Sequence, residues 1–165
     1  MNKKYKILMT TMGLNIGGAE THIVELSKEL KKRGYDVLVA SNGGVYVDEL
    51  TQAGIKHFDV PLNTRNIGKM LTSLKLLKKI IKEEKVDIVH SHARIPGFVT
   101  GILHRSMDFT FVTSAHWVFN TGNGLKYLTN WGQKVIAVSE DIKQYVMDNY
   151  KSKEKDICGT VIGID

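Results

Sequence analysis

The sequence predicts an α/β fold, a doubly wound parallel sheet of the Rossmann-like type. Segments with strand-like apolar runs alternate with segments of helical apolar spacing to the end of the chain. A glycine-rich turn at residues 12–18 joins the first run to the first helical segment, and polar residues collect directly after several later runs. Because strand–helix alternation implies right-handed crossovers between parallel strands, a three-layer α/β/α arrangement follows, with helices on both faces of the sheet.

Short apolar runs bounded by glycine, proline or polar residues predict the strands. They lie at residues 6–11, 36–40, 55–60, 86–92, 110–116, 134–139 and 157–162.

Apolar residues at helical spacing predict the intervening helices. The first begins at Ala19, and the others lie at residues 47–53, 67–85, 96–107, 126–131 and 140–150, of which 126–131 has the weakest pattern. Pro96 suits the first turn of its helix, and Ser139 is a typical N-cap for the last helix. The long helix at 67–85 is expected to bury Ile67, Met70, Leu71, Leu74, Leu77 and Ile81, with Leu76 and Ile80 pointing away from that face.

Length and composition fit one soluble globular domain spanning residues 1–165, with 42% hydrophobic and 24% charged residues. The single cysteine, Cys158, excludes an internal disulfide. No signal peptide or membrane-spanning run is expected. The net charge of +6 is compatible with phosphate ligands, an anionic membrane surface or solubility alone, and no nucleic-acid partner is expected.

The glycine-rich turn is the first candidate for a binding site. Gly17 and Gly18 would let the backbone approach a ligand while the N–H groups of the following helix face an anion, most often a phosphate. A tight turn with close packing explains the glycines equally well. The dinucleotide fingerprint is not met, because Asn15 replaces its second glycine and Ser41 stands where an acidic residue is expected after the second strand. A nicotinamide-dependent oxidoreductase is therefore disfavoured, and the Walker A pattern is absent.

Polar residues also follow the later strands, at the edge where parallel sheets bind ligands. These are residues 41–44, 90–94, 114–117 and 139–140. His90 and His92 would point to the same face of a strand, but no third ligand at a telling spacing accompanies them, so no metal is expected. His22 is interpreted as a surface or packing residue.

Four motifs in order resemble the N-terminal domain of the family 4 (group 1) retaining glycosyltransferases, which form the N-terminal half of a GT-B fold. The motifs are Gly17-Gly18-Ala19-Glu20 followed by Leu26 through Gly34-Tyr35-Asp36-Val37, the run from Val86 to His92, the run from Val112 to His116, and the run from Val135 to Glu140. The closing Val161-Ile162-Gly163-Ile164-Asp165 is similar to the segment that leads into the interdomain linker, with Ile162 in place of the usual Asn.

The resemblance implies a role for individual residues. Gly17 and Gly18 would approach the diphosphate of a nucleotide-sugar donor, and His116 would lie beside the donor sugar as a catalytic residue. Glu20, His92, Arg94 and Ser139 would lie on the acceptor side, where Ser139 caps the helix that faces the cleft. The reaction would transfer a sugar with retention to a hydroxyl group of a glycan, lipid or small molecule, without a cofactor or metal.

The resemblance also implies a missing partner. The family carries a Glu pair spaced E-x7-E in a C-terminal, donor-binding domain, and no two glutamates here stand eight positions apart. Residues 1–165 are therefore expected to form only the acceptor-side domain, and the isolated chain is not expected to transfer sugar. A standalone module that binds a nucleotide or phosphate without catalysis is the alternative.

A lysine-rich helix raises the question of membranes. Lys69, Lys75, Lys78, Lys79, Lys82 and Lys85 lie along residues 67–85. Basic residues beside apolar ones hold peripheral proteins on anionic lipid, although a solvated lysine face is the more frequent arrangement. The expected location is cytoplasmic, with peripheral contact at the inner face of the membrane as a further hypothesis.

Overall fold

Strands and helices alternate along the chain in the computed structural model, which describes residues 4–122, 124–150 and 152–160. The strands are β1 Lys6–Thr10, β2 Asp36–Ser41, β3 Lys56–Asp59, β4 Ile88–Ser91, β5 Thr110–Ala115, β6 Lys134–Ala137 and β7 Ile157–Gly159. The helices are α1 Gly18–Lys32, α2 Val47–Gln52, α3 Ile67–Glu83, α4 Arg94–His104 and α5 Glu140–Tyr150, with 3-10 turns η1 Leu125–Leu128 and η2 Glu154–Asp156.

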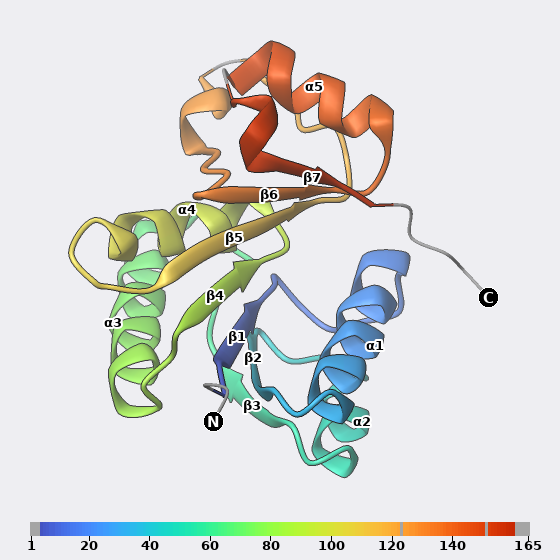
Figure 1. Cartoon of the computed structure of the whole chain (residues 1–165). Helices are drawn as coiled ribbons and strands as arrows, with labels where there is room; N and C mark the ends of the chain where they lie inside the picture. The colour runs from blue at the N-terminus through green and yellow to red at the C-terminus, as the bar shows by residue number, and fades with distance from the viewer. Residues whose placement is uncertain (1–3, 123, 151, 161–165) are drawn as a thin grey trace.

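The strands of the described residues form one parallel sheet in the order β3-β2-β1-β4-β5-β6-β7 (Figure 1). The order reverses between β1 and β4, which pair in register from Ile7 with Ile88 to Thr10 with Ser91. Ligands in such sheets bind beyond the carboxyl ends of the strands, at the point of reversal. The predicted Rossmann-like sheet is confirmed, and its reversal point lies between the glycine-rich turn and the end of β4.

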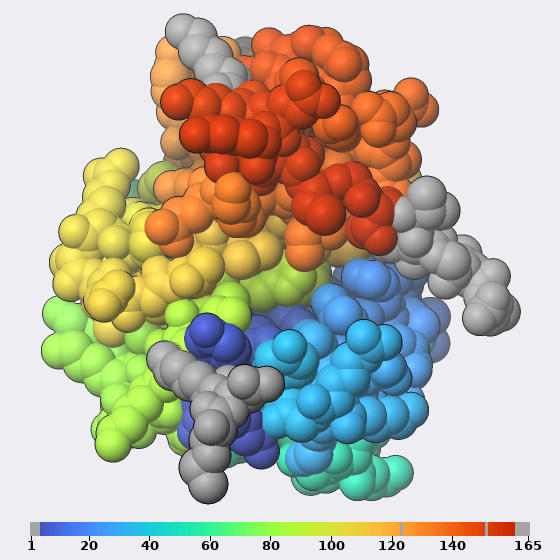
Figure 2. Space-filling view, in the orientation of Figure 1, coloured from blue at the N-terminus to red at the C-terminus, as the bar shows by residue number. Residues whose placement is uncertain are grey.

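Helices cover the two faces of the sheet unequally. One face packs α3 and α4 around a core that includes Leu8, Leu77 and Phe111, and α5 covers the same face farther along the sheet. The other face packs α1 and α2 around Met9, Ile23 and other buried side chains. In the space-filling view, the orange and red residues of β6, α5 and β7 lie above the blue residues of α1 (Figure 2).

The buried face of α3 differs from the predicted one. Ile67 is 77% exposed and Leu71 is 54% exposed, whereas Ile80 is buried. The helix turns Ser73 toward the core, where its single hydroxyl proton is shared between the carbonyls of Pro61 (2.9 Å) and Lys69 (3.0 Å). The predictions that Ile67 and Leu71 are buried and that Ile80 points away are therefore wrong, because a satisfied serine occupies the centre of the buried face.

Several predicted element ends also shift. α3 ends at Glu83 because Lys85 adopts a left-handed backbone conformation (φ 56), a frequent way to terminate a helix. The weak helix at residues 126–131 is a short 3-10 turn that ends at Leu128. β7 ends at Gly159, and residues 161–162 of the predicted last strand lie outside the described residues. Within the part of the chain that the structure describes, no helix combines the length and apolarity needed to cross a bilayer.

Candidate functional site

Four histidines from three elements form a cluster at the carboxyl end of the sheet. His90 lies on β4, His92 follows it, His116 follows β5, and His22 comes from the second turn of α1. The ring centroids are 4.0 Å apart for His90 and His92, 5.6 Å for His92 and His116, and 5.3 Å for His22 and His116. We call these four residues the histidine cluster.

Alternation along the strands explains why the cluster forms. Side chains two positions apart on a strand point to the same face, so His90 and His92 share a face, as do Ser114 and His116. The parallel register pairs His90 with Val112, which places both sets on the side of the sheet covered by α1. His22 extends from α1 toward this face, where its ring contacts that of His116.

Two hydrogen bonds fix the rings. One joins His90 Nε2 to Ser114 Oγ at 2.8 Å, and the other joins His92 Nδ1 to His116 Nε2 at 3.3 Å. Only one of the two nitrogens in the second contact can carry the shared proton when both rings are neutral. The same contact therefore restricts the tautomers of His92 and His116 together. The other nitrogen of His92, Nε2, is buried and has no hydrogen-bond partner among the described residues.

Burial keeps the cluster uncharged. It lowers the pKa of His90 to about 3, with a smaller lowering by the neighbouring charges of His116 and His22. Burial also lowers the pKa of His116 to about 4, the pKa of His92 well below its ordinary value, and the pKa of His22. At neutral pH these rings therefore act as hydrogen-bond donors and acceptors and not as cations, which suits hydroxyl groups and phosphate oxygens.

The glycine-rich turn lies beside this cluster. Gly17 is the N-cap of α1 in an extended conformation, and Gly18 is the first helical residue. His22 lies one turn beyond Gly18 and contacts His116, so α1 connects the turn to the cluster. Apart from its chain neighbours and its own helix backbone, no atom of the described residues lies within 4 Å of the position that a Cβ on Gly18 would take, whereas a Cβ on Gly17 would collide with the carboxylate of Glu20. The surface at Gly18 is open, and Glu20 bends back over Gly17.

Arg94 and Ser139 occupy other positions at the same edge. The Arg94 guanidinium lies 4.7 Å from the Phe119 ring centroid, and its Nη2 donates a hydrogen bond to the carbonyl of Asn120 at 2.6 Å. Ser139 Oγ accepts a hydrogen bond from the backbone N–H of Ile142 at 3.3 Å, which agrees with the predicted N-cap of α5. Neither residue contacts the histidine cluster through a hydrogen bond in the described part of the chain.

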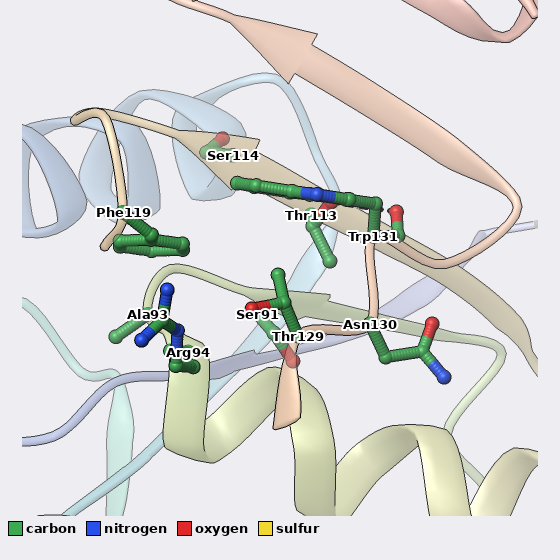
Figure 3. A pocket seen from close by; sticks show the side chains of 9 residues that line it. All are labelled: Ser91, Ala93, Arg94, Thr113, Ser114, Phe119, Thr129, Asn130 and Trp131. Carbon is green, nitrogen blue, oxygen red and sulfur yellow. Dashed lines mark hydrogen bonds between the residues drawn. The ribbon is translucent and has the colours of Figure 1, made fainter. Parts of the chain in front are cut away.

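A small cavity lies between the carboxyl ends of β4 and β5, the start of α4 and residues 129–131 (Figure 3). Phe119 and Trp131 stack across it with centroids 5.3 Å apart, and Thr113 Oγ1 donates a hydrogen bond to the Trp131 carbonyl at 2.7 Å. Its volume is ≈ 10 Å³, which is too small for a sugar. We conclude that this cavity is a packing feature of the connection between β5 and β6, and that Phe119 is part of the core whereas Trp117 is 71% exposed.

The cluster does not have the geometry of a metal centre. Over residues 4–122, 124–150 and 152–160, no three His, Cys, Asp or Glu side chains are placed to hold one metal ion.

Sequence comparison identifies the chain at the level of a family. The model of Glycosyltransferase Family 4 matches residues 16–163, which is most of the chain. The chain belongs to glycosyltransferase family 4. This family 4 chain is 30% identical over 152 residues to one subunit of human phosphatidylinositol N-acetylglucosaminyltransferase, covering 87% of this chain and 31% of the human protein.

Solved structures agree with the family assignment. A glycosyltransferase from Rickettsia africae ESF-5 superposes with a TM-score of 0.84 and 33% identity, over 98% of this chain and 44% of the other. Anabaena Alr3699/HepE in complex with UDP-glucose superposes with a TM-score of 0.77 at 18% identity, over 97% of this chain and 44% of the other, which shows a shared fold. The family 4 chain thus spans less than half the length of these relatives, and its fold is the N-terminal half of a GT-B fold.

Sequence reasoning locates most of these positions but misses His22. The structure brings together His92 and His116. Gly17, Gly18 and Glu20 lie at the start of α1, the helix whose His22 contacts His116, and Arg94 and Ser139 form no hydrogen bond with the histidine cluster in the described part of the chain. His22 stands four residues after Gly18, and that spacing places both on one side of a helix. This i, i+4 relation to the glycine turn is the signal that could have identified His22.

Proposed function

We propose that this chain is the N-terminal, acceptor-side domain of an enzyme that transfers a sugar from a nucleotide-diphosphate sugar to a hydroxyl acceptor with retention of configuration. Its membership of glycosyltransferase family 4 supports the transfer of a sugar. The observation that carries the proposal is the contact between His22 and His116. Because His22 lies on the helix that begins at the open glycine turn, this contact brings the turn and the uncharged imidazole of His116 to one edge of the sheet.

The geometry suggests how each part contributes. Backbone N–H groups at the start of α1 and the positive end of its dipole would stabilise the charge on the leaving diphosphate. The neutral His116 ring would hydrogen-bond a sugar hydroxyl or a phosphate oxygen as positive charge develops on the sugar, and fixed donors of this kind stabilise transition states. His92 would hold the His116 ring in one orientation through the 3.3 Å hydrogen bond.

Glu20 would adjust when a donor binds. Its carboxylate lies over Gly17, where it would repel a diphosphate, so it would turn away toward the acceptor side. There it would accept a hydrogen bond from an acceptor hydroxyl. The further acceptor-side residues Arg94 and Ser139 would supply hydrogen-bond donors.

The rest of the enzyme would come from a second domain. The chain spans 31% of the human relative and 44% of the Rickettsia glycosyltransferase, which is consistent with a missing donor-binding half. No metal or cofactor is proposed. A cytoplasmic enzyme in peripheral contact with the inner face of a membrane fits a lipid acceptor, which is the substrate type named for the human phosphatidylinositol enzyme.

The test is a transfer assay with the longest gene product that contains this chain. UDP-N-acetylglucosamine is the first donor to test because the human relative is an N-acetylglucosaminyltransferase. We expect sugar transfer, and an NMR spectrum of the product in which the anomeric configuration of the donor is kept. An inverted product would refute the retaining mechanism, and no transfer from any nucleotide-diphosphate sugar would refute the proposed function.

Glycine variants test the donor site separately. Gly18→Val adds bulk in a space that the described residues leave open, so we expect normal folding and weaker donor binding. Gly17→Val should displace Glu20 and also exclude the diphosphate. Ala19→Val, one residue farther into the helix, is the matched control. Unchanged donor affinity in both glycine variants would argue against this contact.

The alternative function is a non-catalytic module that binds a phosphate or nucleotide at Gly17 and Gly18. A coding sequence that stops after residue 165 would favour it over the transferase. Tight binding of NADH would instead support an oxidoreductase and contradict the proposal.

A further inference from the structure

An apolar groove lies between α3, α4 and η1, at the same end of the sheet as the histidine cluster. Ile67, Met70, Ile95, Phe98 and Leu128 line it, and its volume is ≈ 270 Å³. α3 and α4 lie side by side along the same face of the sheet (Figure 1). We call this feature the α3–α4 groove.

The groove is not a closed part of the core. Ile67 is 77% exposed at the first position of α3, and Tyr127, next to the groove residue Leu128, is 84% exposed. Large apolar side chains gathered in one exposed hollow are a feature of ligand or membrane contacts more than of ordinary protein surface. An apolar occupant would remove this surface from water.

Two arginines flank the groove. Arg65 and Arg94 contribute to its lining, and among the described residues neither forms an ion pair with a carboxylate. Arginine binds phosphate oxygens through two parallel hydrogen bonds, which makes it well suited to an anionic head group.

The charges of the surrounding sequence have the same sign. Residues 60–82, 88–107 and 109–139 contain ten of the 23 Lys and Arg residues and none of the 17 Asp and Glu residues. Every residue that lines the groove belongs to these stretches. The segments that line the groove therefore carry basic residues and no acidic residue that would neutralise them. This charge balance favours a negatively charged ligand.

We propose that the α3–α4 groove binds the hydrocarbon chain of an acceptor amphiphile whose phosphate head group lies on Arg65 and Arg94. Arg94 begins α4 two residues after His92, so a head group held there would lie at the edge of the sheet that carries the histidine cluster. That this amphiphile is the acceptor rests on the proposed function; its binding to the groove does not.

Binding of water-soluble monoalkyl phosphates to the chain tests the groove directly. Butyl to dodecyl phosphate, each below its micelle-forming concentration, would be titrated by calorimetry and by NMR of the methyl groups. We expect the affinity to rise by up to about fourfold for each added methylene and then to reach a plateau when the groove is full. Alkanols of equal length and inorganic phosphate alone should bind at least about tenfold more weakly, because each lacks one half of the interaction.

Matched variants separate the groove from general surface attraction. Ile67→Glu places a charge in the groove, at a helix position where an acidic residue is compatible with folding, whereas Leu71→Glu places it one turn away, outside the lining. Arg65→Gln removes a flanking charge, and Arg105→Gln removes an exposed charge at the far end of α4. We expect losses of about tenfold or more in the two groove variants and changes within about twofold in the two controls.

The outcomes distinguish the alternatives. Equal losses in the groove variants and their controls, an affinity that rises with chain length without a plateau, or equal binding of alkanols and alkyl phosphates would each overturn the proposal. Flotation with vesicles of phosphatidylcholine and phosphatidic acid gives a second readout, in which Ile67→Glu should reduce binding more than Leu71→Glu. Groove binding by the wild-type chain, with no sugar transfer by the longer gene product, would count against the proposed function alone.

Discussion

Replacing His90 with glutamine should make this domain less sensitive to acid. His90 is 6% exposed, its ring centroid lies 4.0 Å from that of His92, and its Nε2 is hydrogen-bonded to Ser114. Glutamine can reproduce the hydrogen bond to Ser114 but does not titrate. The substitution therefore removes one buried titratable ring while it retains the polar contact.

The magnitude follows from the pKa of His90, which burial lowers from 6.5 to about 3. Between these values the unfolded state binds a proton that the folded state excludes, so the free energy of unfolding falls as the pH falls below 6.5. At pH 5 His90 alone lowers the free energy of unfolding by about 2 kcal/mol relative to pH 7.5. This is a substantial part of the roughly 5–15 kcal/mol that stabilises a typical domain. Above pH 7.5 His90 contributes no slope.

Urea denaturation followed by circular dichroism at pH 7.5 and pH 5 measures this effect. The wild type should lose about 2 kcal/mol more than His90→Gln between the two pH values, whatever the absolute stability of the variant. Measurements at pH 7.5 and 8.5 provide the control, because the free energy of unfolding should change by the same amount in both proteins between these two pH values. Equal losses in the two proteins on acidification would refute the reasoning, because His90 would then take up its proton without unfolding.

Three further predictions test the site and the core. His116→Ala, in the longer gene product, should lower kcat by about 10²–10³-fold, because a hydrogen bond to the transition state is lost. The circular dichroism spectrum should not change. Near-normal turnover would show that His116 is not in the active site. Gly44→Ala should lower the free energy of unfolding by about 1–3 kcal/mol, because residue 44 has φ 141 and a Cβ there would overlap the backbone of Leu14; thermal denaturation without a lower Tm would contradict this. Leu77→Ala should cost about 2–5 kcal/mol in urea denaturation because Leu77 is fully buried, and Leu71→Ala on the exposed side of α3 should cost less than about 1 kcal/mol. Similar losses in the two leucine variants would be evidence against the observed orientation of α3.

The sequence predicts the sheet well because alternation of strands and helices is a strong, repeated pattern. The same logic places His92 and His116 at one edge, since parallel strands end together. The rotation of α3 is harder to predict. Counting apolar residues favours a face through Ile67 and Leu71, and the count ignores Ser73, whose hydroxyl is satisfied by two carbonyls.

Contacts between elements are the least predictable feature. His22 reaches His116 through the packing of α1 against the sheet, and no local pattern specifies the angle of that packing. The α3–α4 groove likewise depends on the spacing between two helices and on a 3-10 turn where the sequence predicts a weak helix. Such features arise from tertiary packing, which the periodicity of a single segment does not specify.

The reversal of strand order has a consequence for synthesis on the ribosome. β1 needs β4 as its second neighbour, and Thr10 pairs with Ser91. Until residue 91 has left the exit tunnel, the nascent chain would present the apolar β1 with one unpaired edge, which is a template for aggregation. Fragments that end before Ser91 should therefore depend on chaperones for solubility, whereas longer nascent chains can complete the centre of the sheet.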